Sequence, residues 1–114
     1  MSDNTDLESR MVAAIRHYRA ALELAEHLER KDASAQRAVT STLLDLERAV
    51  RDKAAPHLKH SLCEIASAAV SRSDNTRTAL VEASARLDSA RLTLADLEQQ
   101  LGYIPKVATA ADHQ

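Results

Sequence analysis

The chain has 114 residues, a formal net charge of −2, one glycine, two prolines and neither tryptophan nor phenylalanine. This length suits one domain with a modest core, and so little glycine, proline and aromatic residue is typical of an almost entirely helical protein. The 15 basic and 17 acidic residues are interspersed, which argues against a basic surface for nucleic acid. No apolar run approaches the roughly 20 residues that cross a bilayer, and the single cysteine cannot form an internal disulfide. We therefore expect a cytoplasmic protein without membrane insertion.

The first predicted helix runs from Thr5 to Arg30. Thr5 and Glu8 have the spacing of a capping box, in which each side chain accepts a hydrogen bond from a backbone N–H at the start of the helix. Apolar residues then recur at alternating steps of three and four, which places them on one side of the helix. They are Met11, Ala14, Tyr18, Ala21, Ala25 and Leu28. The pattern weakens at Asp32, where the sequence is compatible both with a continuous helix and with a turn capped by the Asp32 side chain.

The middle of the chain carries two shorter apolar stripes separated by a proline. In residues 33–53 the stripe is Val39, Leu43, Leu46 and Val50, with Ala35 and Ala49 beside it. Pro56 suits the first turn of a helix and disfavours the helical conformation at Ala55, so we expect the chain to reverse direction there. The next stripe is Leu58, Leu62, Ile65 and Ala69. The polar run 71–76 is either a loop or a slip in the phase of one long helix.

The strongest pattern lies in the last predicted helix, from Thr76 to Leu101. Its apolar positions form a narrow stripe, here called the C-terminal ridge, and charged residues fill the other sides. The ridge consists of Leu80, Ala83, Leu87, Ala90, Leu94, Leu97 and Leu101. So narrow a stripe resembles a coiled-coil seam and requires a partner helix. Gly102 and Pro105 then predict the end of the helix, because glycine adopts the left-handed conformation and proline prevents resumption.

Together these elements predict an all-α, coiled-coil-like fold. Two arms folded back at Pro56 make an elongated antiparallel helical hairpin, whereas breaks near Asp32 and Asp74 would make a bundle of three to four helices. We expect a single helical domain over residues 1–104 and a flexible C-terminal tail over residues 105–114. Because alanine supplies little buried area per residue, the isolated fold should be only marginally stable.

Chemically able side chains are densest just after the proline. His57, His60, Cys63 and Glu64 lie within two helical turns, but Cys63 is too far along the helix from His57 for one ion to take all three easily. The segment superficially resembles the phosphoacceptor motif of histidine phosphotransfer domains, except that Pro56 stands where the acceptor histidine belongs. A shifted role for His57 stays open. We predict no metal site, no cofactor and no catalytic residue, so the chain is not expected to be an enzyme.

The order of features resembles the FlgN type of flagellar export chaperone. The likeness covers the long first helix, the stretches LERKDASAQ and LLDLERAV, and the second arm NTRTALVEASARLDSARLTLADLEQQLGYIP. In that family the C-terminal coiled-coil helix opens near an asparagine and closes shortly before a tyrosine, and Asn75 and Tyr103 would occupy those places. The resemblance implies that the C-terminal helix wraps around an amphipathic segment of a secreted subunit, and that the tyrosine-bearing tail helps delivery to the export gate.

We therefore expect a non-enzymatic helical binding protein, a flagellar or type III export chaperone. Its partner would be an amphipathic helix of a secreted client, with an export-gate component as a further partner. The predicted partner-binding residues are Leu80, Ala83, Leu87, Ala90, Leu94, Leu97, Leu101 and Tyr103. Two alternatives stay open: a histidine phosphotransfer or signalling bundle, and a homo-oligomeric structural coiled coil such as a homodimer.

Overall fold

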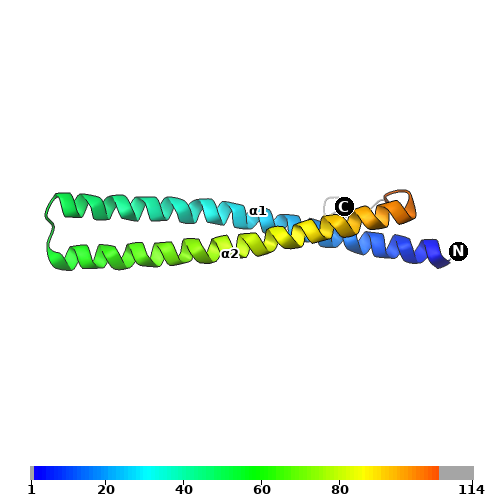
Figure 1. Ribbon diagram of the computed structural model, residues 1–114, viewed down its shortest axis with the longest axis horizontal. Helices are drawn as coiled ribbons and strands as arrows, with labels where there is room; N and C mark the ends of the chain where they lie inside the picture. Colours follow the sequence, from blue (N-terminus) through cyan, green and yellow to red (C-terminus); the bar gives the residue numbers. More distant parts are fainter. Residues whose placement is uncertain (1, 106–114) are drawn as a thin grey trace, which may run out of the picture. The chain divides into compact units, whose positions relative to one another are not determined.

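The protein is built from two long α-helices. The computed structural model describes residues 2–105, in which α1 spans Ser2–Arg51 and α2 spans Pro56–Leu101, with no other helix or strand in that range. A short connection at residues 52–55 joins them (Figure 1). The prediction of an all-α chain is confirmed, and of the two architectures left open the described residues have the helical hairpin. The alternative with three to four helices is not found there, because α1 continues through Asp32 and α2 continues through residues 71–76.

The reversal of the chain is made by hydrogen bonds at the end of α1. The Ala54 N–H donates to the Ala49 carbonyl at 2.9 Å, and the Lys53 N–H donates to the Val50 carbonyl at 3.2 Å. This pair of bonds is the Schellman motif, which places Lys53 in the left-handed position usually given to glycine. Its φ of 52° agrees. Pro56 then opens α2 as predicted, since its missing N–H needs no partner in a first turn.

The outer ends of the helices agree with the sequence at one end only. Gly102 has a φ of 88°, and its N–H donates to the Glu98 carbonyl at 2.8 Å, which is the predicted glycine stop. At the other end α1 already begins at Ser2. Thr5 therefore lies inside the first turns and is not the N-cap, so the predicted capping box is wrong.

Contacts divide the chain into two compact units, each built from a segment of both helices. Unit 1 comprises residues 1–25 and 83–114, and unit 2 comprises residues 26–82. Within each unit a segment of α1 pairs with a segment of α2. The single domain over residues 1–104 stays a prediction. The predicted tail at 105–114 lies outside the described residues except for Pro105.

Unit 1 has a conventional apolar interior. Met11, Ile15 and Leu97 form its buried cluster, and Leu94 and Leu101 pack against it together with Leu7 and Ala14. The side chains that face the other helix, here called the seam, alternate in steps of three and four on both helices. In unit 1 the seam is Leu7, Met11, Ala14, Tyr18, Ala21 and Ala25 on α1, and Ala83, Leu87, Ala90, Leu94, Leu97 and Leu101 on α2.

Unit 2 continues the seam in the same phase but with smaller and more polar residues. On α1 these are Leu28, Asp32, Ala35, Val39, Thr42, Leu46 and Ala49, and on α2 Lys59, Leu62, Ala66, Ala69, Ser73, Thr76 and Leu80. The buried residues of unit 2 are Ala49, Ala66, Ala69 and Thr76. Its interior therefore holds no fully buried large apolar side chain, and the contribution of burial to its stability is small.

Two of the predicted stripes are half right in unit 2, because Val39, Leu46, Leu62 and Ala69 face inward but their other members do not. Leu43 and Val50 were expected to face inward but are 48% and 58% exposed, and Leu58 and Ile65 are likewise exposed. The reason is that neither helix is interrupted. Each helix passes through both units without a break, so the seven-residue repeat set by unit 1 fixes which side of the helix faces inward in unit 2. That side alternates leucine and valine with alanine, serine and threonine, whereas Leu43, Val50, Leu58 and Ile65 lie beside it.

Candidate protein-binding surface

The predicted partner-binding ridge lies in the seam between α2 and α1. Ala83, Ala90 and Leu97 are buried, at 2%, 3% and 4% exposure. The other members, Leu80, Leu87, Leu94 and Leu101, are half-buried. Within one copy of the chain the ridge is therefore occupied mainly by α1, and a partner helix that uses the whole ridge has to displace α1 from it.

Tyr103, the last predicted partner-binding residue, is tied to the first turns of α1. Its hydroxyl donates a hydrogen bond to the Glu8 carboxylate, although 46% of the residue stays exposed. This bond joins the segment after α2 to α1 within unit 1. The hydrogen bond to Glu8, with smaller contributions from desolvation and from the negative charge of Glu8, raises the pKa of Tyr103 above its ordinary value.

Replacing Tyr103 by phenylalanine should make unit 1 less sensitive to alkaline pH. A raised pKa in the folded state means that the contribution of Tyr103 to stability is fully present below its ordinary pKa of about 10 and is lost as the pH rises above it. The free energy of unfolding, measured with urea between about pH 8 and pH 11 to bracket this pKa, should therefore fall more steeply for the unchanged chain than for Tyr103→Phe. Parallel curves would show that the hydroxyl bond contributes nothing. The comparison cancels the titration of lysines, which both chains share.

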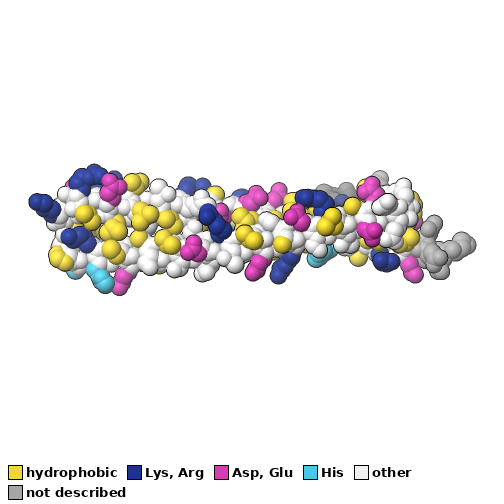
Figure 2. All heavy atoms as spheres, viewed as in Figure 1, with side chains coloured by type: hydrophobic (Ala, Val, Ile, Leu, Met, Phe, Trp, Pro, Cys, Tyr) yellow, Lys and Arg dark blue, Asp and Glu magenta, His cyan; other side chains and the backbone are white. Residues whose placement is uncertain are grey.

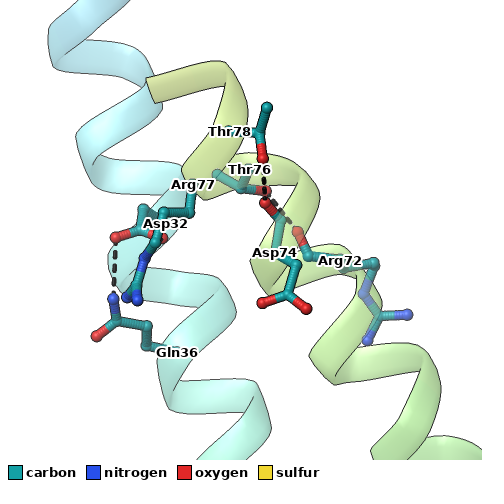
Figure 3. A network of polar contacts seen from close by, with 7 residues as sticks. All are labelled: Asp32, Gln36, Arg72, Asp74, Thr76, Arg77 and Thr78. Carbon is teal, nitrogen blue, oxygen red and sulfur yellow. Dashed lines mark hydrogen bonds and ion pairs between the residues drawn. The ribbon is translucent and has the colours of Figure 1, made fainter. Parts of the chain in front are cut away.

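A polar layer interrupts the seam of unit 2 (Figure 3). Asp32 on α1 lies at a seam position with 14% of its side chain exposed, and Gln36 Nε2 donates to Asp32 Oδ2 at 2.9 Å. Asp32 Oδ1 is buried without a hydrogen-bond partner among the described residues, and Arg77 Nε of α2 lies 4.0 Å from it. Thr76 avoids the same cost because its hydroxyl donates to the Arg72 carbonyl of its own helix. A carboxylate in a seam destabilises the pair but specifies its register.

Large apolar side chains are concentrated on the outside of unit 2. Those at least 40% exposed are Leu43, Leu44, Val50, Leu58, Ile65, Val70 and Val81. Figure 2 shows hydrophobic side chains gathered over both helices of unit 2 near the connection. In the described part of unit 1 the corresponding residues are Leu24, Leu92, Tyr103 and Ile104. Unit 2 thus has seven exposed large apolar residues against four in the described part of unit 1.

Three of these residues, together with the exposed Cys63, lie on one side of the helix pair, here called the apolar flank. It consists of Leu43 and Val50 on α1 and of Cys63 and Val70 on α2. Gln36 precedes Leu43 by seven residues and Arg77 follows Val70 by seven, and both reach Asp32 from the same side in Figure 3. Since seven residues are almost two full turns, the flank residues project to that side as well.

The opposite side of unit 2 has a mixed character. Leu58 and Ile65 of α2 lie there. Asp45 of α1 and Arg72 of α2 lie on the same side, each directly before a seam residue. A partner helix on that side would have to desolvate these charges, which costs free energy unless each finds a partner. On the flank side the charged residues Glu47 and Arg77 already have partners, Arg51 and Asp32, so the flank is the better docking surface.

The histidines and the cysteine after the proline are surface residues. His57, His60 and Cys63 are exposed, and His60 Nε2 lies 3.0 Å from Glu64 Oε1 one turn on. No group of three or more potential metal ligands comes together among residues 2–105. The arrangement offers neither a shielded nucleophile nor a closed ligand set, and nothing in it identifies a phosphoacceptor.

The sequence pattern missed the apolar flank because it assigned the largest residues to the inside. The signal that identifies the flank is the position of each residue within the seven-residue repeat. Counting in steps of three and four from Met11, through Ala25 and Leu28, leads to Val39, Thr42 and Leu46, and leaves Leu43 and Val50 outside. The same count backward from Leu97 leaves Val70 outside.

The fold and its surfaces define a class, the all-α proteins in which two antiparallel helices pair through a seven-residue repeat. Comparison with known proteins adds no family to this class: no family model, curated protein or solved structure matches the chain. Neither helix in the described residues is long and apolar enough to cross a membrane. The exposed surface is therefore the feature of the molecule that bears on function.

Proposed function

We propose that the chain is a non-enzymatic helical binding protein that completes unit 2 with an amphipathic helix of another protein. The observation that carries the proposal is the reversed distribution in unit 2. The buried residues there are alanine and threonine, the large apolar residues of the seam are half-buried, and seven further leucine, isoleucine and valine residues are exposed on the outside. A third helix on the apolar flank would cover Leu43, Val50 and Val70 and turn a two-helix pair into a bundle.

The finer form of the proposal is a cytoplasmic export chaperone of the flagellar or type III kind, which the resemblance of the sequence suggests. Such a protein holds an amphipathic segment of a secreted subunit, prevents its self-association and releases it later. The small buried residues of unit 2 support this form, because a weakly held helix pair that is ordered on binding has a reduced net affinity and releases its partner. The C-terminal ridge remains the second proposed contact, available to a client that replaces α1 in unit 1.

The test uses two neighbouring leucines with opposite expected results. A synthetic amphipathic peptide of about 18 residues, with leucine at the seam positions of a seven-residue repeat, serves as the probe because its length matches about five helical turns. Circular dichroism should show helix gained on mixing beyond the sum of the components. Leu43→Asp should weaken binding about 30-fold or more, the loss typical of a central contact residue.

The matched control is Leu44→Asp. Leu44 is 53% exposed on the same turn of α1 but points about 100° away from Leu43, so its replacement should leave binding unchanged. Equal loss in both variants would mean that the effect comes from added charge or from unfolding. If the peptide binds neither the unchanged chain nor the control, unit 2 is not a helix-binding surface. For the finer form, a client captured through Leu43 but not through Leu44 should be a secreted subunit.

A further inference from the structure

We infer that unit 1 binds an acidic peptide segment of another protein and holds one large apolar side chain of that segment in a groove between α1 and α2. The groove has a volume of about 170 Å³. It is lined by His17, Ala20, Ala21, Leu24, Ala83 and Arg86. All six residues belong to unit 1, so the inference concerns a second surface of the molecule and does not rest on the proposed function.

The groove exists because both helices carry alanine at this level. Ala21 and Ala83 are seam residues, and Ala20 is exposed directly beside the seam on α1. A methyl group leaves the space above it open, and Leu24, one turn after Ala20, forms a wall of that space. The floor of the groove is therefore apolar, and no described side chain fills it.

The size and lining of the groove suit one large apolar side chain. An apolar cavity of about 150 Å³ holds a benzene molecule, so this groove accommodates a phenylalanine ring or a leucine side chain. Leu24 in its wall is 41% exposed. A side chain placed against Leu24 removes apolar surface of both partners from water, which favours binding.

The rim of the groove offers hydrogen-bond donors for an anion. Arg86 on α2 and His17 on α1 both line the groove and are exposed. Among residues 2–105 neither has an ion pair, and Arg86 is not paired with Glu82, four residues before it on α2. The seven-residue repeat places Arg10 on the same side of α1. A guanidinium binds a carboxylate through two parallel hydrogen bonds, so the ligand next to the apolar side chain should be aspartate or glutamate.

The other side of the unit 1 seam lacks this combination. Glu8 there accepts a hydrogen bond from Tyr103, and Arg91 lies 3.4 Å from Asp88. Ile15 on that side is buried and offers little surface to a partner. An acidic apolar segment is therefore favoured on the side that carries the groove.

An NMR titration of the full chain, labelled with ¹⁵N, tests the inference. The probe is an acetylated peptide of about six residues, roughly 20 Å when extended, with phenylalanine between two aspartates and serine elsewhere. It is added up to about 2 mM, which covers millimolar affinity. The amide signals of residues 17–24 and 83–86 should shift. Replacing the phenylalanine by serine, or both aspartates by lysine, should weaken binding at least about 10-fold.

Two substitutions test the groove and its rim separately. Ala20→Leu should fill the groove and weaken binding at least about 10-fold without disturbing the helix, because leucine favours helix and this position is exposed. Arg86→Gln should weaken binding at least about 10-fold by removing the charge. The matched controls are Ala13→Leu, one repeat before Ala20, and Arg16→Gln, an exposed charge about 100° around α1 from His17. Both controls should bind like the unchanged chain.

The possible outcomes are distinct. The inference is overturned if the amide signals of the groove do not shift, or if Ala13→Leu weakens binding as much as Ala20→Leu does. It is also overturned if octanoate, an aliphatic carboxylate, shifts these signals and the peptide does not, because the ligand is then a fatty acid. Leu43→Asp, which should remove helix binding at the apolar flank, should leave binding of the acidic peptide unchanged. The inference and the proposed function can therefore fail independently.

Discussion

Replacing both Leu87 and Leu94 by aspartate is expected to separate α2 from α1 in unit 1. Both side chains are half-buried in the seam, and Leu94 packs against the cluster of Met11, Ile15 and Leu97. The change removes two leucine contacts and places two charges in their place, which should cost at least about 3 kcal/mol. For a chain held by a single seam, a loss of this size is a large part of the total stability.

The measurement is urea unfolding followed by circular dichroism, with amide hydrogen exchange of residues 83–101 as a local readout. Leu92→Asp is the control, because Leu92 is 71% exposed on the same helix and should change the free energy of unfolding by less than about 0.5 kcal/mol. The sequence alone predicts another result, in which partner binding disappears while helicity survives. Survival of full helicity and stability in the double variant would contradict the seam packing of unit 1.

Replacing Asp32 by leucine should, in contrast, raise the free energy of unfolding. The carboxylate is mostly buried, one of its oxygens has no hydrogen-bond partner in the described structure, and the Arg77 guanidinium is 4.0 Å away. Removing a poorly compensated buried charge and filling the seam should stabilise unit 2 by about 1–3 kcal/mol. The same change should make the alignment of α1 with α2 less specific, because a polar seam residue disfavours alignments that place it against apolar residues of the other helix.

Two observations check this expectation. The urea midpoint of Asp32→Leu should rise, while Asp45→Leu, a charge removed from an exposed position of the same helix segment, should leave it nearly unchanged. Light scattering should then detect assemblies larger than those of the unchanged chain, since apolar helices without a polar layer can pair in several registers. A lower urea midpoint for Asp32→Leu would mean that the carboxylate stabilises unit 2 through Arg77 and Gln36.

Local signals predicted much of the fold. Alanine, leucine, glutamate and arginine favour helix throughout, Pro56 marks the start of α2, and Gly102 marks its end. The seam of unit 1 was also predictable, because Met11 and Leu97 are both large and in phase. These signals act within a few residues of one another, so they do not depend on the rest of the chain.

The interior of unit 2 could not be predicted in the same way. There the largest residues and the phase of the helix disagree: size favours Leu43, Ile65 and Val50, whereas phase favours Thr42 and Ala66. Phase prevails because α1 and α2 have no break at which it could change. The Asp32 layer escaped prediction for a related reason, since an aspartate without a neighbouring glycine or proline is compatible with both a helix cap and a helix interior.

The unbroken seven-residue repeat constrains how the chain can change in length. Deleting one residue from the middle of α1 would rotate everything beyond it by about 100° and bring charged side chains to face α2. Removing seven residues from α1 and seven from the matching level of α2 would shorten the pair and leave every remaining contact in register. Insertions and deletions among descendants of this chain should therefore accumulate in the connection at residues 52–55, or occur as paired whole repeats.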